Sequence, residues 1–402
     1  MTEELNSNQR WARAYPELGT APLAIEPCVS PEYFELEREH VFRRVWMNVG
    51  RVEEAPNAGD YFVRDMAVCR TSILVVRGKD GQLRGFHNMC SHRGNKLEWE
   101  KSGHCRGAFT CKFHGWAYDT QGRLMAVPDE ENFFDLKTAE NGLTPVALDT
   151  WQGFIFIHLD IQPKETLRQY LGEITEDLDD YPFDQLPTCF TYRADERVNW
   201  KILLDAQQEG YHVPILHKRT LGRAFLAAEG LSVFRSLSMK MYRRHHLLAS
   251  TGTPGYQPSA AEGLAYRYGT SSLGSLVTLS TGKFRGMIGT FDFYVFFPNF
   301  VIATMPGTYF TYNLWPLAAE RTLWEVRMYY PQAKNAAERF SQEFSKLALR
   351  DALMEDASTH ENIQSMLSSG AKRHFILQDE EAGIRHLHKV VQEHIENGAA
   401  EH

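Results

Sequence analysis

Two short stretches decide the fold of the first half of the chain: Cys90-Ser-His-Arg-Gly-Asn-Lys-Leu97 and Cys111-Lys-Phe-His114. Each stretch offers one thiol and one imidazole. Structural zinc sites usually begin with a Cys-x₂₋₄-Cys pair, which neither stretch contains. One Cys and one His from each of two loops instead suit a [2Fe–2S] cluster, in which two Cys bind one iron and two His bind the other.

Short strand-like runs surround these stretches from about residue 49 to residue 160. Turn residues such as those at 79–82 (KDGQ) and 120–123 (TQGR) separate the runs, which predicts a small, mostly antiparallel β domain. We assign this domain to residues 45–160. Residues 31–48 carry apolar residues at mixed spacings of three and four, typical of an amphipathic helix, so residues 1–44 form an expected N-terminal helical segment.

The second half of the chain, residues 161–402, contains both strand-like runs and segments with the apolar spacing of amphipathic helices. Residues 291–307 and 322–331 predict strands of a large sheet, and residues 336–367 and 381–398 predict long helices. The expected class is therefore α+β, with long helices packed on an antiparallel sheet.

A second group of metal-ligating residue types follows residue 199. We expect a helix over residues 193–212, which would put Glu209 and His212 on one face. Pro214 disfavours continuation of the helix, so the chain can turn and bring His217 back beside His212. Two imidazoles and a carboxylate on one face are the donor set of non-haem Fe(II) oxygenases. The simpler alternative is a pair of core or surface histidines.

The motifs CSHRGNKL (90–97) and CKFHGWAYDTQGRL (111–124) resemble the Rieske iron–sulfur domain. Together with the segment 199–217, they make the chain similar to the α (catalytic) subunit of Rieske non-haem iron ring-hydroxylating oxygenases. The resemblance implies a small antiparallel β Rieske [2Fe–2S] domain and a helix-grip catalytic domain with a mononuclear non-haem Fe(II). The implied ligands are Cys90, His92, Cys111 and His114 for the cluster, and His212 and His217 for the iron.

The resemblance also implies the third iron ligand, an Asp on a late helix that a Glu and a Gln follow. Asp356, with Glu361 and Gln364 after it, stands at the family's spacing. Asp351 lies in the same predicted helix and is the competing choice. We expect the side chains of Asp351 and Glu355 to lie on solvated faces.

Glu209 stands at the position where most members of the family carry an Asp that bridges subunits. The resemblance implies that Glu209 links His212 to the cluster ligand His114 of a neighbouring subunit and carries electrons between them. Branches that act on quaternary amines such as carnitine and betaines resemble this chain in using Glu there. Asp205, one helical turn earlier, is a further candidate close to the iron ligands.

The implied function is the oxygenase component of a multicomponent enzyme, a monooxygenase or dioxygenase. It would use O2 and NAD(P)H-derived electrons from a separate ferredoxin or flavin reductase, since no G-x-G-x-x-G fingerprint appears. The first hypothesis is hydroxylation of an aromatic or other cyclic substrate, as in aromatic hydrocarbon catabolism. The alternatives are oxidative demethylation or C–N/C–O cleavage, including quaternary amines, and a non-enzymatic Rieske electron carrier. The family's head-to-tail homotrimer (α3) is the expected assembly.

Charge and hydropathy exclude other classes of function. The 402 residues carry 43 Lys+Arg against 51 Asp+Glu, a net charge of −8, which argues against nucleic-acid or membrane-surface binding. No apolar run reaches the ~20 residues of a membrane span, and the polar N-terminus lacks a signal-peptide core. We therefore expect a cytoplasmic protein.

Local basic residues between His92 and Lys112 would either steer an acidic ferredoxin or face a neighbouring subunit. The expected pocket-lining segments are residues 216–234 and 291–310.

Overall fold

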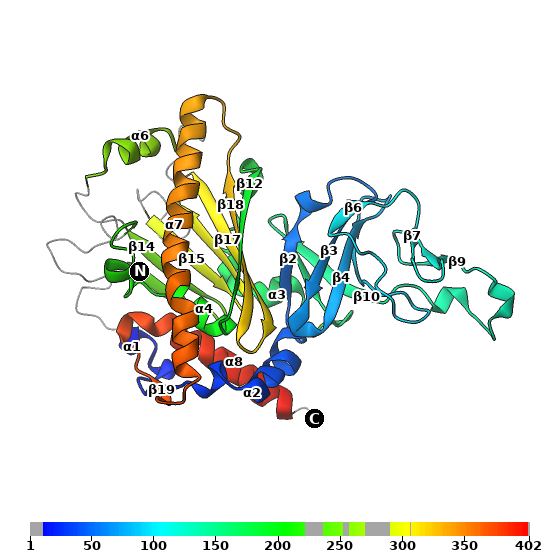
Figure 1. Ribbon diagram of the computed structural model, residues 1–402, viewed down its shortest axis with the longest axis horizontal. Coiled ribbons are helices and arrows are strands. Elements are labelled where there is room, and N and C mark those ends of the chain that lie inside the picture. Colours follow the sequence, from blue (N-terminus) through cyan, green and yellow to red (C-terminus); the bar gives the residue numbers. More distant parts are fainter. Residues whose placement is uncertain (1–10, 222–235, 252–256, 270–289, 306, 401–402) are drawn as a thin grey trace. The chain divides into compact units, whose positions relative to one another are not determined.

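The computed structural model describes residues 11–221, 236–251, 257–269, 290–305 and 307–400 (Figure 1). Contacts between residues divide the chain into two compact units. Arg38–Tyr170 form the first unit, and the described residues on either side of this range form the second.

The first unit is built on antiparallel β-structure, as its alternating pattern of turn residues and short apolar runs predicts. Its main sheet has seven strands in the order β2-β11-β10-β5-β4-β3-β6, and β7, β8 and β9 form a smaller sheet. The strands are β2 (Met47–Arg51), β3 (Asp60–Met66), β4 (Thr71–Arg77), β5 (Leu83–His87), β6 (Ser102–His104), β7 (Phe109–Thr110), β8 (Ala117–Tyr118), β9 (Leu124–Ala126), β10 (Pro145–Trp151) and β11 (Phe154–His158).

The core of this unit reaches the two Cys/His stretches. Cys90 and Cys111 belong to the same buried cluster as Trp116, Tyr118 and Phe109. The loops between β5 and β6 and between β7 and β8 are thus anchored to the core at their cysteines. Loops tied to the core in this way can hold ligands in fixed positions.

The described part of the second unit is built on a seven-stranded antiparallel sheet in the order β12-β18-β17-β16-β15-β14-β13. Its strands are β12 (Thr188–Glu196), β13 (Ser238–Met241), β14 (His246–Thr251), β15 (Thr290–Phe296), β16 (Phe300–Met305), β17 (Thr308–Ala318) and β18 (Arg321–Tyr330). The predicted strands at 291–307 and 322–331 are therefore present. Both faces of β17 are buried, so large apolar side chains stand at consecutive positions, such as Tyr309–Phe310 and Leu314–Trp315, and do not simply alternate with polar ones.

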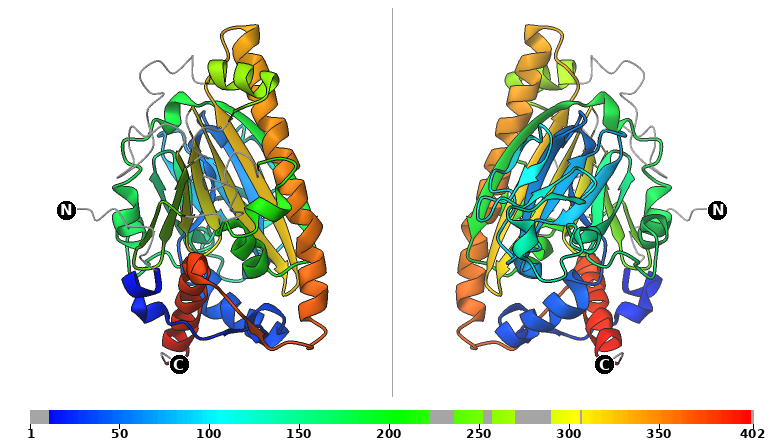
Figure 2. Two further views of the ribbon diagram at one scale, coloured as in Figure 1. Left: turned by 90° about the vertical axis from the view of Figure 1, so that its left-hand side faces the viewer. Right: turned by 90° about the vertical axis from the view of Figure 1, so that its right-hand side faces the viewer.

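Helices cover this sheet. The helix α7 (Ala336–Leu367) begins at Asn335, whose side chain accepts a hydrogen bond from the Glu338 N–H, and it runs along one face of the sheet (Figures 1 and 2). The short helix α4 (Trp200–Gln207) contacts both α7 and β17. The other α-helices of the described residues are α1 (Trp11–Ala14), α2 (Pro31–Glu37), α3 (Leu167–Leu171), α5 (Val213–Leu216), α6 (Ala260–Gly269) and α8 (Ala382–Ala400).

The N-terminal segment packs with this second unit. Its strand β1 (Leu23–Ala24) pairs with β19 (His374–Phe375), and α2 contacts α8. After α2 the chain makes a π-helical turn at Arg38–Phe42 and then enters β2.

The predicted α+β class, with antiparallel sheets and long helices, is confirmed. The predicted helix over 193–212 is wrong in its first part. Residues 193–196 continue β12, because they pair in register with β18 up to Glu196. The helix starts only after Asn199, whose side chain accepts from the Lys201 N–H. None of the described helices is both long and apolar enough to cross a bilayer.

A buried ion pair joins the N-terminal segment to α4. The side chains of Glu37 and Lys201 are both fully buried and contact each other, and the Trp200 indole N–H donates to Glu37 over 3.0 Å. Removing one partner leaves a buried charge without compensation, which typically costs about 3–5 kcal/mol. We therefore predict that Glu37→Ala lowers the free energy of unfolding by about this amount in urea denaturation followed by tryptophan fluorescence.

Glu393→Gln provides the matched control, because Glu393 pairs with Lys389 on the exposed side of α8. An exposed pair is worth less than about 1 kcal/mol, so this variant should unfold close to the wild type. Equal effects of the two substitutions would contradict the prediction.

Candidate metal centres

The two Cys/His loops of the first unit share one backbone pattern. In the first loop the Cys90 N–H donates to Asn95 O over 2.9 Å, and the Gly94 N–H donates to Cys90 O over 3.0 Å. In the second loop the Cys111 N–H donates to Trp116 O over 2.8 Å, and the Gly115 N–H donates to Cys111 O over 3.0 Å. Donor and acceptor are thus five and four residues apart in both loops. Each loop curls around its cysteine in the same way.

The glycines are required at the tightest point of each loop. Gly94 has φ of 75° and Gly115 has φ of 76°, in the left-handed region that a side chain disfavours. This geometry explains why a glycine follows each ligand pair in the sequence. It also turns successive backbone N–H groups toward the sulfur atoms, where they can donate to thiolates.

The four side chains of the two loops gather on one side. Cys90 and Cys111 are buried, and the rings of His92 and His114 lie 4.6 Å apart between centroids. The indole of Trp116 stacks on His92, with the ring centroids 5.0 Å apart. The loops therefore present two sulfurs from the core and two imidazoles nearer the surface.

This donor set fits a Rieske cluster. Burial by itself would raise the pKa of the Cys111 thiol, but donation from the Phe113 N–H and the Asn95 side chain lowers it overall. His92 Nδ1 is buried and has no hydrogen-bond partner among the described residues. A buried nitrogen in this state is costly unless a ligand uses its lone pair. Thiolate-stabilising donors and a free imidazole nitrogen are what a two-Cys, two-His cluster needs.

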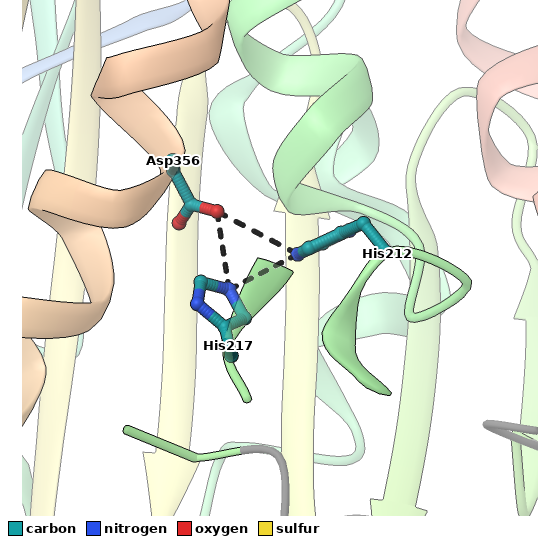
Figure 3. A group of neighbouring side chains, drawn as sticks. All are labelled: His212, His217 and Asp356. Carbon is teal, nitrogen blue, oxygen red and sulfur yellow. Dashed lines mark hydrogen bonds and ion pairs between the residues drawn. The ribbon is translucent and has the colours of Figure 1, made fainter. Parts of the chain in front are cut away.

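In the second unit, three donor atoms converge (Figure 3). The Nε2 atoms of His212 and His217 lie 3.1 Å apart, and Asp356 Oδ1 lies 3.6 Å from the first and 3.1 Å from the second. Three atoms bound at right angles, each ~2.1 Å from one ion, are separated by about 3 Å. Asp356 Oδ1 is buried and makes no hydrogen bond with the described residues. The geometry and the free acceptor fit a mononuclear metal site.

The sequence positions these donors by ending one helix and starting another. The helix α4 ends at Gln207, residues 208–212 form a loop, and α5 starts at Val213 with Pro214 in its first turn. His212 and His217 therefore flank a single turn of helix. The prediction that Glu209 and His212 share a helix face is wrong, because both residues lie in this loop. Their side chains nevertheless contact each other directly.

Each histidine is held from behind by a glutamate. Glu209 Oε1 contacts His212 Nδ1, while Glu209 Oε2 accepts from the N–H groups of Tyr211 and His212. Glu355 Oε2 lies 2.9 Å from His217 Nδ1. The expectation that Glu355 faces solvent is wrong, because α7 turns this residue toward the His217 loop. Sequence spacing carried no signal for this contact, since the two residues are 138 positions apart.

The other predicted residues on α7 have different contacts. Asp351 is exposed and pairs with Arg350 over 2.6 Å, so the structure brings Asp356 and not Asp351 to the histidines. Glu361 pairs with Arg197 over 2.9 Å. Gln364 Oε1 accepts from the Asn199 N–H over 2.8 Å, which ties α7 to the start of α4.

Asp205 makes its hydrogen bonds with residues other than the three converging donors. Its carboxylate accepts from the Gln208 amide over 2.9 Å and lies 2.8 Å from His388 Nε2 on α8. Asp205 therefore links α4 to α8. Its predicted role near the iron ligands stays a prediction.

Four aromatic rings cluster on the sheet of the second unit. Phe291 and Phe293 of β15 and Phe310 and Tyr312 of β17 form a continuous set of ring contacts, with centroids 5.3–6.1 Å apart. Burial, and then the charge of Asp356, raise the pKa of Tyr312 well above its ordinary value, so Tyr312 lies within electrostatic range of this carboxylate. Part of the other predicted lining segment, at 222–234, lies outside the described residues.

Two family models match the chain. The ring-hydroxylating α subunit (catalytic domain) model covers residues 183–397, more than half of the chain, and the Rieske [2Fe–2S] domain model covers residues 45–147. The chain belongs to the ring-hydroxylating α-subunit family of Rieske oxygenases. The predicted family and both predicted cofactors, the [2Fe–2S] cluster and a mononuclear non-haem iron, are thereby confirmed.

The curated relatives of this Rieske oxygenase chain are named for different substrates. It is 32% identical to the large subunit of anthranilate 1,2-dioxygenase from Acinetobacter baylyi, over 50% of this chain and 44% of the relative. It is 34% identical to the oxygenase subunit of carnitine monooxygenase from Escherichia coli K12, over 46% of this chain and 49% of the relative. The chain thus spans about half the length of the curated relatives it matches.

Solved structures share the fold over nearly the whole chain. A quaternary ammonium Rieske monooxygenase superposes with a TM-score of 0.75 at 21% identity, covering 98% of this chain and all of that one. Naphthalene 1,2-dioxygenase from Rhodococcus sp. superposes with a TM-score of 0.71 at 21% identity, covering 96% and 97%. These likenesses establish the fold of the Rieske oxygenase chain.

A tyrosine hydroxyl lies against Cys90, a predicted cluster ligand of this Rieske domain. Tyr118 Oη accepts from the Ser91 N–H over 3.0 Å, which leaves its own O–H to donate to Cys90 Sγ, 3.3 Å away. A donor to sulfur stabilises the reduced, more negative cluster. Losing about 1 kcal/mol of this preference shifts a one-electron couple by about 40 mV. We predict that Tyr118→Phe makes the midpoint potential of the cluster more negative by about that amount, measured by redox titration.

Tyr61→Phe is the control for this measurement. The Tyr61 hydroxyl donates to Glu98 over 3.0 Å instead of to a cluster ligand. An equal shift in both variants would show that the hydrogen bond to sulfur is not the cause.

Proposed function

We propose that this chain is the oxygenase component of a multicomponent Rieske non-haem iron oxygenase. One observation carries the proposal: His212, His217 and Asp356 bring three metal donors together in a chain that also has a Rieske domain. An electron carrier needs no second metal with open coordination positions, so the convergence argues against the carrier hypothesis. Bound iron would supply the open positions at which O2 reacts beside an organic substrate.

Each part of the proposal has its own residues. Cys90, His92, Cys111 and His114 hold the cluster in the domain at 45–160, and the three donors hold the iron in the domain at 161–402. Residues 1–44 form the N-terminal segment that precedes both domains.

The proposed electron path crosses a subunit boundary. Glu209 holds His212 on one side and, in a cytoplasmic homotrimer, meets His114 of a neighbouring subunit. The contact of Glu209 with His212 supports this bridge, because a carboxylate shared by two imidazoles fixes both rings. The solved structure of a quaternary ammonium Rieske monooxygenase has been described as revealing insights into inter-subunit electron transfer.

Electrons arrive from a separate ferredoxin or flavin reductase. Cation–π contacts on the surface near the cluster loops support this proposal. Lys112 Nζ lies 4.6 Å from the centre of the exposed Trp99 ring, and the Arg93 guanidinium lies 5.3 Å from that of the exposed Phe113 ring. Such a surface suits either an acidic electron donor or the neighbouring subunit.

The proposed substrate is an aromatic or other cyclic compound that receives one or two oxygen atoms. The cluster of four rings that includes Tyr312 supports this substrate class, because aromatic faces pack favourably against planar rings. The anthranilate relative agrees with it. A second candidate is oxidation of a quaternary amine, favoured by Glu209 in place of Asp and by the carnitine relative.

Turnover with a substrate panel tests the proposal. The protein with both metals, reduced by dithionite, is given O2 and a panel of aromatic acids and trimethylammonium compounds. We expect product mass to increase by one or two oxygens for a ring substrate, whereas release of formaldehyde would indicate demethylation. Asp356→Ala is the control, which should keep the cluster spectrum and form no product. Absence of product from every class in the metal-loaded wild type would contradict the proposal.

The bridging role of Glu209 makes a separate prediction. Glu209→Gln keeps the length of the side chain but removes its charge, so we expect both metals to remain while steady-state turnover falls at least tenfold, the low end for loss of such a carboxylate partner. Single-turnover reduction of the iron by the cluster, followed by stopped-flow absorbance, measures the step directly. Glu393→Gln on exposed α8 is the matched control. Unchanged electron transfer in Glu209→Gln would sink this assignment.

A further inference from the structure

The far side of His217 has a partner arrangement of its own. Glu355 Oε2 lies 2.9 Å from His217 Nδ1, and the Thr220 hydroxyl donates to the same oxygen over 2.6 Å. His217 is almost fully buried, with 3% of its surface exposed. The imidazole is thus held between Glu355 behind it and Asp356 in front of it.

This arrangement determines which ring nitrogen carries the proton. A carboxylate oxygen accepts hydrogen bonds, so His217 Nδ1 must donate to Glu355. In the neutral ring, Nε2 then has a free lone pair. That lone pair faces Asp356 Oδ1, 3.1 Å away, and His212 Nε2, also 3.1 Å away. Glu355 therefore selects the tautomer in which His217 can bind a metal.

We propose that Glu355 is a positioning residue for the mononuclear iron, which holds His217 in its metal-binding tautomer and orientation and is itself held by Thr220. The inference rests on the proposed function, because it assumes iron at the three converging donors. Glu355 touches neither substrate nor the reacting atoms, and it acts through His217.

The helix α7 makes this double contact possible. Consecutive residues on an α-helix point about 100° apart, so Glu355 and Asp356 leave α7 in different directions. Asp356 points toward the metal donors, and Glu355 reaches the back of the His217 ring. One turn of α7 thus supplies both a ligand and the support of a second ligand.

Thr220 extends the support to the chain beyond His217. It lies three residues after His217, in the turn that follows α5, and its hydroxyl donates to Glu355. The loop is thereby joined to α7 at the His217 ring and again at Thr220. Glu209 gives His212 a comparable partner, but Glu209 belongs to the same loop as His212. Glu355 is the one of these two carboxylates that fixes the loop to another element.

A purely structural role for Glu355 is the competing explanation. In that case the Glu355–His217 contact would only join the loop to α7, and its loss would lower stability without changing the metal site. The two explanations differ in metal affinity and in the electronic structure of the bound metal. Activity alone would not separate them.

The experiment compares metal binding in variants whose Rieske cluster is intact. A chelator removes the mononuclear metal, and anaerobic titration with Fe(II) gives its dissociation constant. We expect Glu355→Ala to weaken Fe(II) binding about 10–100-fold, the usual effect of losing the partner of a ligating histidine. Glu355→Gln should retain more affinity than Glu355→Ala, because an amide oxygen still accepts from Nδ1–H. Thr220→Val should weaken binding less than Glu355→Ala.

Asp351→Asn is the matched control, because Asp351 lies one turn earlier on α7, is exposed and pairs with Arg350. It should bind Fe(II) as the wild type does. The electron paramagnetic resonance spectrum of Co(II) at the site adds a readout that a structural role would not change. We expect it to change in Glu355→Ala and to return toward the wild-type spectrum in Glu355→Gln.

Fe(II) affinity in Glu355→Ala within twofold of the wild type would overturn the proposal, as would a lower melting temperature with unchanged affinity and spectrum. If Glu355→Ala does not fold, wild-type affinity in both Glu355→Gln and Thr220→Val would overturn it instead. Failure of the proposed function has a different signature. Fe(II) binding that is unchanged in Asp356→Ala would show that the three donors are not the iron site, whatever Glu355 does.

Discussion

Three acceptor atoms face one another in the interior of the second unit, and much of the surrounding structure serves to keep them there. Glu209 and Glu355 each accept a hydrogen bond from the Nδ1–H of one histidine, so both Nε2 lone pairs point inward toward Asp356 Oδ1. Without a cation, lone pairs about 3 Å apart repel one another in a low-dielectric site. A bound divalent metal converts the same geometry into a set of favourable bonds. The folding of this region and metal binding are therefore energetically coupled.

Contacts far from the three donors fix the positions of α4, the loop that follows it and α7 relative to one another. Gln364, two turns beyond Asp356 on α7, accepts from the backbone at the start of α4 and donates to Cys28 O in the N-terminal segment. The buried pair of Glu37 and Lys201 anchors the same end of α4. Because a metal site tolerates displacements of only a few tenths of an ångström, these distant contacts affect the chemistry as well as the stability. The N-terminal segment thus supports the site without contributing a ligand.

The cluster loops solve a similar problem by repetition. Both loops curl around a cysteine with the same pair of backbone hydrogen bonds, and both use a glycine with positive φ to do so. Each ligand pair is local in sequence, so its spacing and its glycine can be recognised without knowing the rest of the fold. The two carboxylates behind the iron-site histidines differ in this respect. Glu209 is three residues from His212, whereas the contact of Glu355 with His217 spans 138 positions.

Local patterns in the amino-acid sequence predicted the antiparallel strands and the long helices at 336–367 and 381–398, which the structure shows at Ala336–Leu367 and Ala382–Ala400. They also selected four candidate cluster ligands and two candidate iron ligands, and the structure brings His92 close to His114 and His212 close to His217. Periodicity and short ligand spacings are properties of neighbouring residues, and they persist in any fold that uses them. The choice of Asp356 came from the spacing of a family resemblance, and the contacts of α7 with the loop now give it a geometric reason. The sequence analysis predicted that Glu355 is exposed to solvent and that Glu209 lies within a helix, and both predictions were wrong. A sequence pattern defines which faces a helix has, but only the packing of α7 against the loop after α4 decides which residues those faces meet.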